Sequence, residues 1–147
     1  MEVVFTALSN KALFPEKNES LISFFSPEPL VIQPGEIRKV KTYLSLDLNL
    51  TEGTFLFLET PRELLDKFVS LFPQTPCIDS GPFDISLHNC GQSQVNILPE
   101  KLIAIGRILT KLITFSLSSL EYAPNKEEKK KRLPIPARGD KFKFEIK

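Results

Sequence analysis

Few side chains in this sequence are suited to metal binding or nucleophilic chemistry. The chain contains two cysteines, Cys77 and Cys90, and a single histidine, His88. Because these three residues do not follow the spacing of metal-binding motifs, we predict no metal site and no resident cofactor. In an intracellular protein we expect both cysteines to be reduced thiols.

The charges are distributed unevenly along the 147 residues. Residues 123–147 carry nine Lys/Arg against four Asp/Glu, whereas residues 1–122 carry ten against fourteen. An acidic body with a basic tail lacks the basic stripe of a nucleic-acid-binding domain, so we expect no nucleic-acid partner. A basic run in the tail resembles a nuclear-import signal, with a solvated linker as the alternative interpretation: Lys129, Lys130, Lys131 and Arg132.

The sequence predicts an intracellular protein with no membrane partner. No apolar run is long enough to span a bilayer, and residues 1–5 lack the basic start and apolar stretch of a signal peptide. We expect a cytoplasmic protein that also enters the nucleus if the basic run acts in import. The length suits one domain, which we place at 1–122 and follow with a basic tail or arm at 123–147.

Short apolar runs separated by turn residues predict many short strands. Leucines alternate with polar residues from Leu44 to Leu50, which is typical of a strand with one buried face. The segment 54–59 is apolar on both faces and is expected to be a central strand. Further strands are predicted at 83–87, 94–98 and 141–146, and the pattern of 102–113 fits either a strand, which we favour, or a helix.

One helix is predicted at about 60–72. Thr60 can serve as its N-cap, Pro61 suits the first helical position and Glu63 completes a capping box. The apolar residues that follow recur at helical spacing and would form one buried face: Leu64, Leu65, Phe68, Val69 and Phe72. Several short strands with one helix indicate a β-barrel or β-sandwich.

From residue 30 to residue 112, the order of these features resembles the trimeric dUTPase family. The resemblance rests on four segments and a possible arm: Pro34-Gly35-Glu36 before the alternating strand, Pro61-Arg62 before the helix, Cys77-Ile78-Asp79-Ser80-Gly81 at the start of the substrate hairpin, Leu102-Ile103-Ala104, and Arg138-Gly139 with Phe142. It implies a dUTPase-like β-barrel or jelly-roll-type sandwich. The chain is most similar to the degenerate dUTPase-related proteins of herpesviruses and adenoviruses.

The resemblance also implies roles for four residues. Asp79 takes the position of the carboxylate that activates water, with capping of the Ser80-Gly81 turn as the alternative. Arg62 matches a phosphate-binding arginine, with a surface charge as the alternative. Arg138 and Phe142 match an arm that closes over the nucleotide of another subunit, whereas a terminal strand is the other interpretation. Hydrolysis would require Mg²⁺ on the triphosphate.

Several positions depart from the family's pattern. No Tyr follows Asp79, the hairpin is shorter, and Phe83 is predicted to point into the core. Glu63 adds negative charge near the phosphates, and Ser23 replaces a metal-binding Asp. We therefore expect a catalytically inactive viral protein that binds host proteins, whose identity the sequence does not give. The alternative is a divergent dUTPase that hydrolyses dUTP to dUMP and pyrophosphate. The sequence does not decide whether the oligomeric state is a monomer or a homotrimer.

Overall fold

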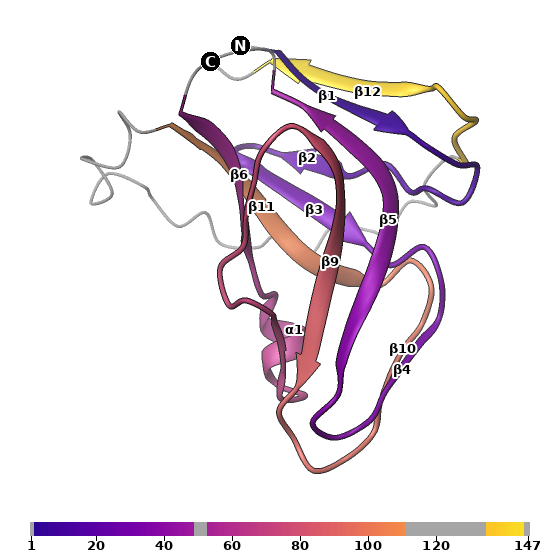
Figure 1. Cartoon of the computed structure of the whole chain (residues 1–147), viewed down its shortest axis with the longest axis vertical. Helices are drawn as coiled ribbons and strands as arrows, with labels where there is room; N and C mark the ends of the chain where they lie inside the picture. Colours follow the sequence, from indigo (N-terminus) through magenta and orange to yellow (C-terminus); the bar gives the residue numbers. More distant parts are fainter. Residues whose placement is uncertain (1, 49–52, 111–134, 146–147) are drawn as a thin grey trace.

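Two antiparallel sheets dominate the computed structural model, which describes residues 2–48, 53–110 and 135–145 (Figure 1). The first sheet has five strands, in the spatial order β12 (Lys141–Glu145), β1 (Glu2–Ala7), β5 (Ile37–Asp47), β9 (Gly81–Asn89) and β7 (Val69–Leu71). The second has the order β2 (Glu16–Asn18), β3 (Leu21–Phe25), β11 (Leu102–Thr110), β6 (Thr54–Glu59) and β8 (Cys77–Ile78). A separate two-stranded sheet joins β4 (Leu30–Ile32) to β10 (Val95–Ile97). The predicted mainly β fold is therefore confirmed.

The hydrophobic core lies between the two five-stranded sheets. Phe24 of β3 packs edge-on against Phe5 of β1 and Phe83 of β9, with ring centroids 5.6 and 5.7 Å apart. Phe83 is 8% exposed, which confirms the prediction that it points inward. Edge-to-face ring pairs add about 1 kcal/mol each to the burial of apolar area, so this cluster ties one sheet to the other.

The strand predictions are confirmed within the described residues. In β5, Leu44 and Leu46 are buried and Ser45 between them is only half-buried, as the alternation predicted. Strand β6 lies between β11 and β8, so the segment 54–59 is indeed an inner strand. The predictions at 83–87, 94–98, 102–113 and 141–146 correspond to β9, β10, β11 and β12, with residues 111–113 and 146 outside the described part.

The predicted helix at 60–72 is wrong in its extent. Helix α1 spans only Arg62–Leu65, and its N-cap residue is Pro61, without a side-chain cap. The predicted capping box is therefore not formed. Instead of capping a helix, the Thr60 hydroxyl accepts a hydrogen bond of 3.0 Å from the backbone N–H of Leu71.

Pairing with the sheet ends the helix early. Phe68 adopts a left-handed conformation, with φ 61°, which reverses the chain after α1. The next residues form β7, in which Val69 pairs with Asn89 and Leu71 with Leu87 of β9. Val69 and Leu71 are completely buried, so strand periodicity, not helical periodicity, fits this segment to the core.

The tail contributes a strand to the first sheet. Strand β12 pairs with β1, with Val3 opposite Phe144. The proposed boundary between residues 122 and 123 and the basic run 129–132 both lie outside the described residues. Among the described residues, no helix is long and apolar enough to cross a membrane.

Candidate functional site

Asp79 lies in the short connection between β8 and β9. Its side chain is exposed and forms no hydrogen bond or ion pair with any other described residue. The neighbouring Ser80 fixes the turn, because its Oγ accepts a hydrogen bond of 3.1 Å from the backbone N–H of Leu48. Gly81 follows with φ 123°, a conformation that favours glycine. The Asp79 carboxylate is thus free to face solvent.

Arg62 lies far from Asp79 within the chain. It is the exposed first residue of α1, and the equally exposed Glu63 follows it. Strand pairing places Ile78 opposite Leu56, six residues before Arg62, which corresponds to about 20 Å along an extended chain. Figure 1 shows α1 beside the end of β9, whereas Asp79 precedes the start of that strand.

Arg138 and Phe142 lie at the edge strand of the first sheet. Arg138 is exposed in the turn before β12, which is closed by a hydrogen bond of 2.8 Å from the Ala137 N–H to the Asp140 carboxylate. Phe142 stacks against Phe14 with ring centroids 6.1 Å apart and packs on the core. Strands β1 and β5 separate β12 from β9. A single chain therefore does not bring Asp79, Arg62 and Arg138 together.

The segment around α1 and β7 exposes large apolar side chains that were predicted to form a buried helical face. Leu65, Phe68 and Phe72 are 51%, 70% and 50% exposed, and we call these three residues the α1–β7 surface. Only Leu64 and Val69 of the predicted apolar face are buried. Large exposed apolar side chains grouped in one short segment are typical of surfaces that contact another molecule.

A thiol–imidazole pair lies next to this surface. The Cys90 Sγ is 3.3 Å from Nδ1 of His88 and 3.9 Å from Oγ of Ser70. The ring of His88 also packs edge-on against Phe72, with centroids 6.0 Å apart. This pair was not predicted from the sequence, because its spacing matches no metal-binding motif. The available signal was the separation of two residues at a strand end, which can place side chains on the same face.

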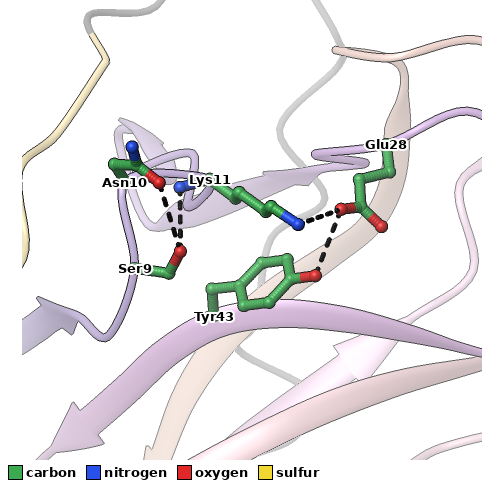
Figure 2. Close-up of polar contacts among 5 residues, drawn as sticks. All are labelled: Ser9, Asn10, Lys11, Glu28 and Tyr43. Atoms are coloured by element: carbon green, nitrogen blue, oxygen red, sulfur yellow. Dashed lines mark hydrogen bonds and ion pairs between the residues drawn. The ribbon is translucent and has the colours of Figure 1, made fainter.

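A second polar cluster, shown in Figure 2, surrounds Tyr43. The Tyr43 hydroxyl donates a hydrogen bond of 3.1 Å to the Glu28 carboxylate, which also pairs with the Lys11 ammonium at 3.5 Å. The Lys11 ammonium lies 5.9 Å from the centre of the Tyr43 ring. Partial burial raises the pKa of Tyr43, the hydrogen bond and negative charge of Glu28 raise it further, and Lys11 partly offsets them.

Contacts between neighbouring residues fix the turn that carries Lys11. The Ser9 hydroxyl accepts a hydrogen bond of 3.2 Å from the backbone N–H of Lys11 and lies 3.5 Å from the side-chain oxygen of Asn10. Tyr43 itself occupies an irregularity of β5, where the pairing with β9 shifts between Lys41 and Leu44. Its φ is 57°, an unusual value for a bulky residue.

A depression of about 280 Å³ opens between the edges of the two sheets, beside β2 and β12. Lys17 lies over the Phe144 ring at 5.5 Å, and Ile108 and Glu145 complete much of the lining. None of the residues predicted to serve dUTP hydrolysis line it. No group of three or more His, Cys, Asp or Glu side chains in the described ranges could hold a metal ion.

Solved structures of phage dUTPases share this fold. Neither the models of known protein families nor the curated proteins include a match. A mutant dUTPase of Staphylococcus bacteriophage 80alpha, solved with dUpNHpp, is 18% identical with a TM-score of 0.65, over 93% of this chain and 93% of that one. The dUTPase of phage phi11 of S. aureus is 17% identical with a TM-score of 0.64, over 88% of this chain and 97% of that one. The chain therefore has a dUTPase-like β fold.

Proposed function

We propose that this chain is a dUTPase-derived viral protein, similar to the degenerate dUTPase-related proteins of herpesviruses and adenoviruses, that does not hydrolyse dUTP and acts by binding host proteins. The observation that carries the proposal is the α1–β7 surface. At the place where the family resemblance locates a phosphate-binding motif, the chain presents the exposed side chains of Leu65 and Phe68. Such side chains suit a protein interface far better than a triphosphate.

Charge at the same place argues against phosphate binding. Arg62 is followed by Glu63, and both side chains are exposed. A carboxylate beside the only arginine of the motif repels an incoming triphosphate and offsets the attraction of the guanidinium. Helix α1 has only four residues, so its dipole adds little attraction for a phosphate.

The predicted hairpin that would hold a base and a sugar is not formed, because residues 81–89 make one continuous strand, β9, and β8 belongs to the other sheet. Only Asp79 and Ser80 connect β8 to β9, so the chain enters β9 directly at Gly81. The first aromatic residue after Asp79 is Phe83, which lies in the core between Phe5 and Phe24. Phe83 is thus not available to stack on a sugar, and a site that lacks such a group discriminates poorly.

Catalysis can be tested directly. Purified protein is mixed with dUTP and Mg²⁺, pyrophosphate release is followed, and the melting temperature is measured with and without a non-hydrolysable dUTP analogue. We expect no turnover and no shift, because a ligand that binds only the folded state would raise the melting temperature. The alternative is a divergent dUTPase in which Asp79 activates water. Turnover that disappears in Asp79→Asn would establish it and refute the non-enzymatic proposal.

Binding requires a separate test. Tagged protein is used to recover partners from the natural host cell, alongside a Leu65→Ser, Phe68→Ser double variant. A matched control is Leu98→Ser, because Leu98 is 61% exposed but lies outside the α1–β7 surface, after β10. We expect a partner that is retained by the control and lost by the double variant. Equal recovery with all three proteins would show that this surface is not the interface.

A further inference from the structure

We propose that Cys90 is a reactive thiol, activated by His88, that forms a mixed disulfide with small aromatic or apolar disulfides. The thiolate, not the thiol, is the nucleophile in such an exchange. The Cys90 Sγ lies 3.3 Å from Nδ1 of His88, which is within the range of a hydrogen bond to sulfur. The imidazole is therefore placed to accept the thiol proton. This proposal does not depend on whether the protein hydrolyses dUTP.

Buried hydrogen bonds hold the two side chains in place. Asn89, between them, is completely buried and donates from its amide to the carbonyls of Ile32 and Ser93, at 3.0 and 2.8 Å. The backbone N–H of Cys90 donates to the carbonyl of Phe68 at 2.8 Å. The backbone on both sides of the thiol is thus fixed, so the pair does not depend on a chance orientation of a flexible loop.

The surroundings of Cys90 are both open and apolar. Cys90 is exposed. The exposed Phe68 covers Gly91, since a Cβ built at Gly91 would lie 3.1 Å from that of Phe68. On the other side, the ring of His88 packs against the half-exposed Phe72. A disulfide that carries an aromatic or apolar group can approach the thiol and contact these rings, which favours that chemical class of reagent.

The exchange needs only the disulfide itself as oxidant. The Cys90 Sγ passes its proton to Nδ1 of His88 and attacks one sulfur of the disulfide R–S–S–R. The new bond joins Sγ to S–R, the old S–S bond breaks, and the second sulfur leaves as a thiolate that takes up the proton. Cys90 is oxidised to a mixed disulfide and one equivalent of R–SH is produced.

Cys77 provides an internal comparison within the same molecule. It is also an exposed free thiol, but among the described residues its Sγ hydrogen-bonds only to the backbone carbonyl of Thr75, at 3.9 Å. A carbonyl oxygen cannot accept and retain a proton as an imidazole can. The two cysteines therefore differ in the presence of a base and not in exposure.

The test compares the two thiols in the folded chain. The aromatic disulfide dithiobis-nitrobenzoate is added at pH 7, released thionitrobenzoate is followed by absorbance, and mass spectrometry assigns the modified residue, with Cys77→Ser and Cys90→Ser to isolate each rate. Because a base that accepts the thiol proton speeds the attack on a disulfide, we expect Cys90 to react roughly tenfold faster than Cys77. We expect His88→Gln to abolish this advantage and to leave the rate of Cys77 unchanged.

Two results would overturn the proposal. One is equal reactivity of Cys90 and Cys77 in the folded protein, and the other is a Cys90 rate that does not change in His88→Gln. If His88→Gln does not fold, the wild-type protein decides the question in concentrated guanidinium chloride. There the two rates should become equal, and an advantage of Cys90 that persists in the unfolded chain would show that the folded arrangement is not its cause.

Discussion

Tyr43 holds a backbone conformation that glycine would adopt at a lower cost. Its φ of 57° falls in the left-handed region, at the irregularity where the pairing of β5 with β9 shifts. Its side chain bonds Glu28 and contacts Lys11. To separate the backbone cost from these contacts, we compare Tyr43→Gly with Tyr43→Ala, since both variants remove the whole phenol.

At an ordinary strand position the alanine variant is more stable than the glycine variant. At Tyr43 we expect the reverse order of stability. A non-glycine residue in the left-handed region costs roughly 1–2 kcal/mol, which alanine pays and glycine does not. Against this, glycine loses about 0.5–1 kcal/mol more conformational entropy than alanine on folding. We therefore expect Tyr43→Gly to be more stable than Tyr43→Ala by about 0.5–1 kcal/mol.

Urea unfolding with linear extrapolation measures both free energies, and similar m-values would show that the unfolded state is unchanged. Ser45 supplies the matched control, because it is half-buried in the same strand and is not among the described residues with positive φ. At that position Ser45→Ala should be more stable than Ser45→Gly by about 0.5–1 kcal/mol. If Tyr43→Ala equals or exceeds Tyr43→Gly in stability, the backbone at Tyr43 is not strained and the reasoning fails.

Three further predictions use the same measurement. Gly106→Ala should cost about 1–3 kcal/mol, because its Cβ would lie 2.8 Å from Leu56 and 2.9 Å from Phe24 in the buried core; an unchanged stability would contradict this packing. Asn89→Ala should cost about 3 kcal/mol, because it removes two amide donors and the acceptor of the Gly91 N–H; a loss below about 1 kcal/mol would show that these bonds matter little. The stability advantage of wild type over Tyr43→Phe should be constant below pH 10.0 and decrease above it, since the unfolded chain releases the phenolic proton first; a rise there would refute the raised pKa of Tyr43.

The sheets could be predicted from the sequence because their signal is repeated along each strand. Leu44 and Leu46 alternate with polar residues over the length of β5, and the core selects the register that buries them. The prediction of β6 as an inner strand followed from its apolar residues on both faces. Such patterns show which side chains are buried, and the burial of those side chains determines where these strands form.

The helix prediction failed because its signals were local. Thr60, Pro61 and Glu63 match the preferences of a helix start, yet each preference is worth only about 1 kcal/mol. Burial of Val69 and Leu71 between the sheets, together with pairing to β9, outweighs that sum. A pattern confined to one segment does not reveal which distant strand will compete for it.

The candidate site was harder to predict than the fold, since its residues contribute little to the core. Arg62, Asp79 and Arg138 are all exposed, and His88 and Cys90 meet on either side of the buried Asn89. Hydrophobic periodicity carries no information about such side chains. The same independence allows the fold to persist while the chemistry on its surface changes.

The segment after Asp79 shows a limit of this independence, because its residues also serve the fold. An aromatic residue could be restored after Asp79 at Gly81 or Phe83. At Gly81 the φ of 123° strains any other side chain, so a tyrosine there would change the turn that Ser80 holds against Leu48. At Phe83 a tyrosine would bring its hydroxyl into the ring cluster with Phe24, where a buried hydroxyl without a partner costs roughly 1–3 kcal/mol. Neither of these two substitutions can rebuild a sugar-stacking ring without disturbing the fold.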